Sequence, residues 1–122
     1  MAVTFQRRTF QPGDIVFSKG DPGSSLYLVE KGIVEIWRDG TTERRVLGRI
    51  EAGGLFGEMA VFDRQPRMAS ATAIEETVVL EMPGSIVRHA MNRADPLLVQ
   101  LIHAMLNHIR TLARKLDEDT AT

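Results

Sequence analysis

Turn signals at short intervals constrain the fold of this chain more than any other feature. They recur every seven to fourteen residues through its first half, a spacing typical of an all-β barrel or sandwich. The signals are Gly13-Asp14, Gly20-Asp21-Pro22-Gly23, Lys31-Gly32, Asp39-Gly40 and Gly53-Gly54. The segments of β-forming residues between and after them are 15–17, 26–29, 33–37, 46–50, 69–73 and 77–82. We predict about eight strands in all.

The segment 33–37 predicts which side chains of one strand face the interior. Val34 and Ile36 alternate with Glu35, and Arg38 follows. Because successive side chains of a strand point to opposite faces, we expect Val34 and Ile36 in the core. Glu35 and Arg38 are expected outside it.

The composition favours one small cytoplasmic domain. The chain has 122 residues, of which 43% are hydrophobic, enough for one core but not for a second folded domain. Its formal net charge of -1 offers no positive field to a nucleic-acid backbone, so we expect no nucleic-acid binding by this chain alone. The absence of cysteine excludes a disulfide framework and thiol catalysis, and it agrees with a reducing compartment. No segment has the length of a membrane span or the apolar core of a signal peptide, so we expect no membrane contact.

The pattern becomes helical after Pro83. Residues 85–93 contain no turn signal and are predicted to form a short helix. Asp95 then offers an N-cap carboxylate, and Pro96 suits the first position of a helix. A long helix is therefore expected over residues 96–119, within the same domain as the β part.

The apolar residues of the predicted long helix follow heptad spacing. They are Leu98, Ile102, Met105, Ile109, Leu112 and Leu116. This stripe either packs on the chain's own β part, residues 1–95, or forms a seam with a second copy. Both arrangements can coexist, because Leu97, Leu101 and Leu106 widen the apolar surface. We predict a homodimer through residues 96–116.

Residues 56–70 combine the features of an anion site. Gly57 lets backbone approach a ligand closely, and the N–H groups of a short helix beginning near Glu58 would point at an anion. Arg67 adds a permanent charge whose planar fork matches phosphate oxygens, and Pro66 stiffens the chain before it. Glu58 suits a phosphate ligand only if a sugar separates the two, with a sugar hydroxyl donating to the carboxylate. The pair favours a ribose phosphate; the alternative is two ordinary solvated surface residues.

The same segment resembles the phosphate-binding cassette of the cyclic nucleotide-binding domain family, which includes the catabolite activator and the protein kinase A regulatory subunit. The family pattern Phe-Gly-Glu-hydrophobic-Ala-hydrophobic, then Pro-Arg-x-Ala-Ser/Thr, is met from Phe56 to Ser70 without a gap. The likeness continues upstream through the glycines between Phe10 and Val34 and covers roughly residues 8–116. It implies a mainly β fold with C-terminal helices. That fold is a double-stranded β-helix, or jelly-roll-like β-roll, followed by a short and a long α-helix.

The resemblance also implies roles for individual residues. Glu58 would hold the ribose 2'-hydroxyl, and Arg67 would pair with the cyclic phosphate. The residues whose backbone N–H groups would complete the phosphate cradle are Gly57, Met59, Ala60 and Met68. The other ligand-binding residues implied are Phe56, Pro66, Ala69 and Ser70, of which the last two would line the pocket. No metal is implied.

The ligand implied by the resemblance is a cyclic mononucleotide, cAMP or cGMP. In the family a hydroxyl residue directly after the arginine tends to favour guanine. Met68 stands there and offers no hydroxyl, which points to cAMP, although its flexible bulk leaves the preference open. The domain is then expected to act as a signalling sensor whose C-terminal helices move when ligand binds.

Two alternatives remain open at the level of sequence. The family's helix-turn-helix DNA reader does not follow the long helix, so the chain is either a stand-alone sensor or the sensor part of a transcription regulator without its DNA-binding domain. Some family members have lost nucleotide binding and serve as dimerisation or interaction modules. The presence of both Glu58 and Arg67 argues against this second alternative.

An enzyme is not expected. The histidines are His89, His103 and His108, and the last two are five residues apart, a spacing that does not share one face of a helix. No Asp or Glu cluster in the sequence supplies metal ligands beside them.

Overall fold

Two four-stranded antiparallel sheets make up the β part of the chain. One contains, in spatial order, β1 (Gln6–Phe10), β8 (Thr77–Pro83), β3 (Ser25–Lys31) and β6 (Leu55–Phe56). The other contains β2 (Ile15–Phe17), β7 (Ser70–Ala73), β4 (Ile33–Asp39) and β5 (Arg44–Glu51). The computed structural model describes residues 5–120, except the side chains of residues 113, 114 and 116–120. Within these residues the predicted β-roll of eight strands is confirmed.

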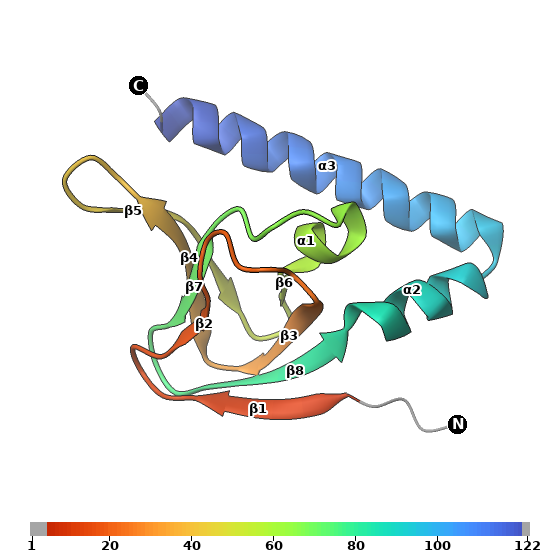
Figure 1. Cartoon of the computed structure of the whole chain (residues 1–122), viewed down its shortest axis with the longest axis horizontal. Coiled ribbons are helices and arrows are strands. Elements are labelled where there is room, and N and C mark those ends of the chain that lie inside the picture. The colour runs from red at the N-terminus through yellow and green to blue at the C-terminus, as the bar shows by residue number, and fades with distance from the viewer. Residues whose placement is uncertain (1–4, 121–122) are drawn as a thin grey trace.

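Strands from opposite ends of the β part close the roll. β1 pairs with β8 from Gln6 opposite Glu81 to Phe10 opposite Thr77, and β2 pairs with β7. The inner faces of both sheets meet in a core of mostly aliphatic and aromatic side chains. That core consists of Phe10, Tyr27, Val29, Val34, Phe56, Ala71, Ala73 and Val79. Figure 1 shows the roll on the side of the molecule away from the turn that joins the last two helices.

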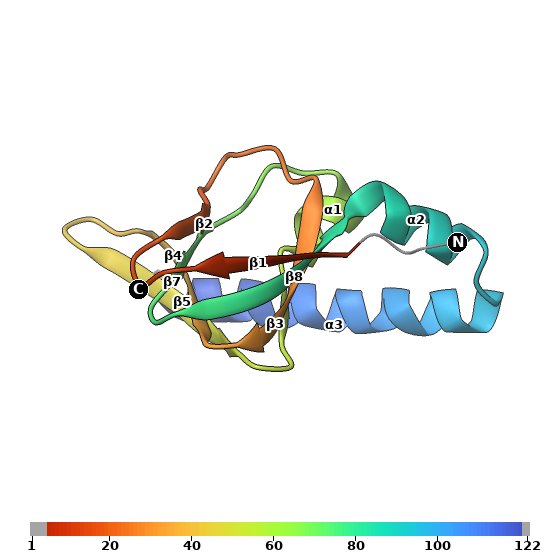
Figure 2. The ribbon, with the colours of Figure 1, turned by 90° about the horizontal axis from the view of Figure 1, so that it is seen from below.

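Three helices accompany the strands in the described part of the chain. α1 (Glu58–Asp63) lies between β6 and β7, α2 (Gly84–Asn92) follows β8 directly, and α3 (Pro96–Thr120) is the long helix. Asp95 caps α3 as predicted, because its Oδ1 accepts a hydrogen bond from the Leu97 N–H at 2.8 Å. The two views in Figures 1 and 2 show α3 running back along the roll, on the side where α1 lies in Figure 1. No helix among residues 5–120 is long and apolar enough to span a membrane.

Glu35 on β4 lies outside the apolar core, as predicted, yet it is only 8% exposed. Two arginines of the neighbouring strand cover it: Arg44 Nη1 is 3.4 Å and Arg49 Nη2 is 3.6 Å from its carboxylate oxygens. Arg44 also stacks on Trp37, with its Cζ 3.8 Å from a ring centroid. The outer face of this sheet is therefore a packed layer of charged and aromatic side chains.

Most of the apolar stripe on α3 does not pack on the roll. Leu106 is buried at 5% exposure, whereas Met105 is 59% exposed, and Leu98 and Leu112 are also exposed. Leu97 and Leu101 are exposed as well. The side chain of Leu116, predicted to continue the stripe, lies outside the described part of the structure.

Candidate functional site

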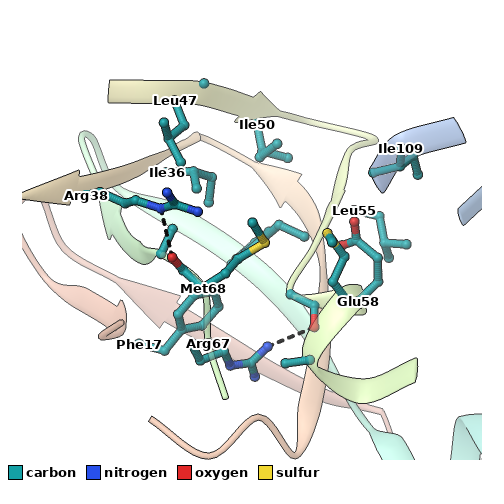
Figure 3. Close-up of a pocket in the computed structure, with 16 residues that line it drawn as sticks. Phe17, Ile36, Arg38, Leu47, Ile50, Leu55, Glu58, Arg67, Met68 and Ile109 are labelled. Atoms are coloured by element: carbon teal, nitrogen blue, oxygen red, sulfur yellow. Dashed lines mark hydrogen bonds between the residues drawn. The ribbon is translucent and has the colours of Figure 1, made fainter. Parts of the chain in front are cut away.

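A pocket of about 250 Å³ opens between the roll, α1 and α3 (Figure 3). Its walls come from four strands (β2, β4, β5 and β6), Gly57 and α1, the segment before β7 and one residue of α3. The lining residues are Phe17, Ile36, Arg38, Leu47, Gly48, Ile50, Leu55, Phe56, Gly57, Glu58, Met59, Ala60, Arg67, Met68, Ala69 and Ile109. The lining combines Arg38, Glu58 and Arg67 with mostly aliphatic and aromatic side chains, which suits a ligand that is part anion and part apolar ring.

Eight of the ten predicted ligand-binding residues line this pocket; Pro66 and Ser70 do not. Pro66 is exposed in the segment before β7. Ser70 is buried in β7, and its hydroxyl accepts a hydrogen bond from the Lys19 N–H at 2.9 Å. The Ser70 side chain therefore fixes the backbone at Lys19. It does not line the pocket, where it was predicted to lie.

Gly57 joins β6 to α1 in a conformation that requires glycine. Its φ is +81°, and a Cβ built there would lie 2.8 Å from Arg67 Nη1 and 3.3 Å from Tyr27 Cδ2. α1 begins at the next residue, and no side chain caps its first turn. The backbone N–H groups at the start of a helix lack partners within the helix, so those of α1 can bind an anion.

The long side chain of Arg67 is fixed by hydrogen bonds and ring packing. It is 5% exposed; its Nη1 donates to the Gly57 carbonyl at 2.8 Å and its Nη2 to the Ser25 carbonyl at 2.6 Å. Its Cζ lies 4.1 Å from the Phe17 ring centroid. The Arg67 N–H donates to the Asp21 carbonyl at 2.9 Å, which fixes the backbone as well. Burial lowers the pKa of the guanidinium, yet an arginine side chain stays protonated in proteins, so the pocket holds a fixed positive charge.

Two buried side-chain atoms among the described residues have no hydrogen-bond partner, and both belong to the pocket wall. One is the acceptor Glu58 Oε2 and the other is the donor Arg67 Nε. Burial raises the pKa of the Glu58 carboxyl, opposed by its own backbone N–H and by the charge of Arg67. A buried polar atom without a partner is unusual in a native protein and points to a ligand that supplies one. Here the ligand must offer both an anionic acceptor and a donor.

The raised pKa of Glu58 predicts a gain in stability when its charge is removed. A carboxyl whose pKa is raised by folding stabilises the native state below its unfolded pKa, and this stabilisation is lost as the pH rises through the folded value. At pH 7 we therefore expect Glu58→Gln to increase the free energy of unfolding of the ligand-free protein by about 1 kcal/mol. This corresponds to a rise in melting temperature of roughly 4 °C. Thermal melts from pH 4 to pH 8 measure this, with the exposed Glu76→Gln as the control. An equal or lower melting temperature for Glu58→Gln at pH 7 would contradict it.

The structure adds pocket residues that the sequence did not single out. Ile109 was predicted on the apolar stripe but not in the pocket, and Arg38 was expected only outside the core. Gly48 lies inside β5, and a glycine within a strand is a recognised signal of a ligand or backbone approaching closely. Among the described residues, no three His, Cys, Asp or Glu side chains gather as metal ligands.

Comparison with known proteins gives the same family by sequence and by structure. The family model described as "Cyclic nucleotide-binding domain" matches residues 7–94. The cyclic AMP receptor protein of Thermus thermophilus is 42% identical over 79 residues, which are 64% of this chain and 37% of that protein. The crystal structure of the Thermus thermophilus catabolite activator protein matches with a TM-score of 0.78 and 35% identity, over 95% of this chain and 55% of that chain.

A third similar protein is the EAL enzyme Bd1971. Its cAMP-bound form matches with a TM-score of 0.73 and 29% identity, over 95% of this chain and 32% of that chain. Its cGMP-bound form matches with a TM-score of 0.71 and 32% identity, over 86% of this chain and 28% of that chain. The chain spans only 37% to 46% of the Thermus thermophilus and Mycobacterium tuberculosis regulators that it matches. Because the family model covers most of the chain and includes the segment that carries Glu58 and Arg67, this chain belongs to the cyclic nucleotide-binding domain family.

Proposed function

We propose that this chain is a regulatory sensor domain that binds a cyclic mononucleotide in the pocket. The observation that carries the proposal is the pair of unpartnered buried atoms, Glu58 Oε2 and Arg67 Nε, in two residues that line the pocket. A ribose cyclic phosphate complements both, since its phosphate oxygens accept and its free hydroxyl donates. No metal is needed, because Arg67 and the N–H groups of α1 meet the phosphate charge.

The pocket gives the ligand one orientation. The phosphate would lie between Arg67 and the start of α1, and the ribose hydroxyl would donate to Glu58. The base then extends toward the aliphatic side chains of β4 and β5 and toward Ile109 of α3. An apolar enclosure of this kind favours the flat faces of a base over water.

We propose cAMP as the ligand. Met68 lines the pocket directly after Arg67 and offers no hydroxyl to a guanine. The Thermus thermophilus relative is named a cyclic AMP receptor protein, and Bd1971 has a cAMP-bound form. The proposal predicts preference for cAMP over an open nucleotide, because the phosphate of 5'-AMP carries more charge and lacks the cyclic geometry.

A thermal-shift experiment tests the proposed function. A ligand that binds only the native state should stabilise it by about 2.7 kcal/mol at 100 times its dissociation constant. We expect cAMP, and to a lesser extent cGMP, to raise the melting temperature in a concentration-dependent way, and 5'-AMP to have little effect. No shift with either cyclic nucleotide at millimolar concentration would overturn the proposal.

The same site supports a regulatory role and assigns no catalytic residue. We propose a cytoplasmic sensor in signal transduction. Because the chain spans 37% of the Thermus thermophilus receptor, the sensor part of a larger regulator stays a second candidate. A binding-incompetent interaction module is disfavoured, because burying Glu58 and Arg67 costs free energy that only a ligand-binding role would justify.

We also propose that ligand binding is coupled to α3. Ile109 lines the pocket, and its neighbour Arg110 forms a two-point ion pair with Asp63, the last residue of α1. Arg110 Nε donates to Asp63 Oδ2 at 2.9 Å, and Nη2 donates to Oδ1. The helix that would bind the phosphate is thus tied to the helix that would cover the base. A ligand that contacts both favours the docked arrangement, which is the condition for coupling.

Hydrogen exchange measures this coupling. With cAMP we expect slower exchange in α1, around Arg67 and in α3 near Ile109. In Arg110→Ala, cAMP should still slow hydrogen exchange in α1 but should slow it less in α3, because the ion pair between Arg110 and Asp63 is lost. Arg93→Ala, which removes an exposed arginine outside this contact, serves as the control. If cAMP protects only the segment around Glu58 and Arg67 in the wild type, the coupling is wrong and the domain is a passive binder.

The exposed apolar stripe of α3 supports a homodimer as the assembled form. Leu98, Met105 and Leu112 lie along one side of the helix and are all more than half exposed. Exposed apolar surface of this length on a single helix is typical of an association face. We therefore propose that α3 pairs with α3 of a second copy while Leu106 and Ile109 face the roll.

A further inference from the structure

Gly48 of β5 is a glycine that the backbone does not require. The structure describes all ten glycines of the chain, and each of the others either has a positive φ or would place a Cβ closer than 3.0 Å to another atom. Gly48 shows neither feature: its φ lies outside the positive region, and a Cβ built on it would meet nothing within 4 Å. A glycine inside a strand weakens the strand. The missing side chain therefore points to a role outside the fold itself.

The empty side-chain position at Gly48 faces the pocket. Gly48 lines the pocket and is paired with Ile36 of β4, which lines it too. Residues directly opposite each other in an antiparallel pair place their side chains on the same face of the sheet, and the Ile36 side chain packs against the core. A side chain at Gly48 would therefore project into the pocket.

A β-bulge shapes the wall beside Gly48. The register of β4 and β5 shifts so that Ile36 is opposite Gly48 and Trp37 is opposite Val46, which leaves Leu47 without a partner. Leu47 and Gly48 both line the pocket, although neighbouring residues of a regular strand face opposite ways. In the view of Figure 3, Leu47 lies across the pocket from the arginine that would bind the phosphate. The open space thus belongs to the wall that the base would face.

The reach of a base from the phosphate depends on its number of rings. In the proposed orientation, Arg67 and Glu58 fix the phosphate and the ribose. A purine is joined to the ribose through its five-membered ring, so its six-membered ring extends further from the sugar. A pyrimidine ends after one ring. The six-membered ring of a purine is therefore the part of the ligand that would reach the wall at Gly48.

We propose that Gly48 is a specificity-determining residue: it leaves room for the second ring of a purine and so selects cyclic purine nucleotides over cyclic pyrimidine nucleotides. The inference rests on the proposed cyclic nucleotide site and deepens it. The flat faces of the second ring contact the aliphatic wall, whereas a single ring leaves this space to water. The glycine weakens β5 in the empty protein, and the contact with the base offsets that cost when ligand is bound.

The test compares dissociation constants for cAMP and cyclic CMP in wild type, Gly48→Ala, Gly48→Val and Val46→Ala. Gly48→Val should weaken cAMP binding by at least about tenfold, because the added isopropyl group occupies the space of the second ring. Cyclic CMP should lose much less affinity. Gly48→Ala adds only a methyl group, so its effect should lie between wild type and Gly48→Val. Val46 is exposed on β5 outside the pocket lining, so Val46→Ala should leave both constants unchanged.

The stability of the ligand-free protein separates this role from damage to the fold. Valine suits a strand better than glycine and would meet open space here, so Gly48→Val should raise the ligand-free melting temperature by about 4 °C. The role of Gly48 predicts this gain in stability together with weaker cAMP binding. A lower melting temperature would contradict the open space at Gly48 and overturn the inference.

The affinities overturn the role of Gly48 in two further cases. One is cAMP binding by Gly48→Val within about twofold of wild type, and the other is an equal loss of affinity for cAMP and cyclic CMP. Both outcomes leave the binding site itself intact. If wild type binds neither cAMP nor cGMP, the proposed function fails, and the role of Gly48 falls with it.

Discussion

Arg67→Ala is expected to lower the affinity for cAMP by at least about 100-fold, the loss typical of removing one partner of a buried ion pair. The phosphate would keep the N–H groups of α1 but would lose the fixed charge opposite them. Calorimetric titration of wild type and variant measures the effect. Binding of cAMP by Arg67→Ala within about threefold of wild type would refute the phosphate assignment.

The structure also predicts a cost in stability for the same substitution. Arg67 donates to the carbonyls of Gly57 and Ser25, and both lose their donor when the side chain is removed. A buried polar group left without a partner costs about 1 to 3 kcal/mol, so a lower melting temperature is expected. Titrations must therefore be made below the melting temperature of the variant. Arg67→Lys is the matched control, because it keeps the charge without the planar fork and should bind with intermediate affinity.

Met105→Glu is expected to convert a dimer into a folded monomer. Met105 lies near the middle of the exposed stripe of α3 and is 59% exposed, so a glutamate there is harmless in the monomer. Across a two-fold seam it would bring two carboxylates into an apolar interface, at a cost of about 3 kcal/mol or more. Light scattering after size exclusion at several concentrations measures the mass. Met105 is a better site for this test than Ile109, which also lines the pocket.

His103→Glu is the control for the dimer. His103 is exposed and lies on the opposite side of α3 from Met105, so the same new charge should leave the dimer intact. Monomeric wild-type protein at all concentrations would contradict the proposed assembly. So would a Met105→Glu protein that remains dimeric.

Local signals in the sequence were sufficient for most of the fold. Glycine turns and β-forming segments predicted six of the eight strands by position, and the Asp95-Pro96 pair predicted the start of α3. The two strands not located were β1 and the two-residue β6. β1 is a mainly polar strand that exists because it pairs with β8, far away in the sequence, and such pairing leaves little local pattern.

The candidate site was predictable where its residues are close in sequence. Glu58 and Arg67 lie in one segment, and their roles depend on spacing along the chain. The walls at the base end come from β4, β5 and α3, and Arg38 and Ile109 reach the pocket only through tertiary packing. Ser70 shows the reverse case. Its position in the motif predicted a place on the pocket wall, but in the structure its hydroxyl accepts a hydrogen bond from the Lys19 N–H.

A crystal structure of the protein with cAMP tests the central claim most directly. We predict one nucleotide per chain in the pocket, with phosphate oxygens within about 3 Å of Arg67 and of backbone N–H groups at the start of α1. The ribose hydroxyl should donate to Glu58, and the base should lie between β5 and Ile109. A nucleotide bound elsewhere, or one whose phosphate faces away from Arg67, would contradict the account.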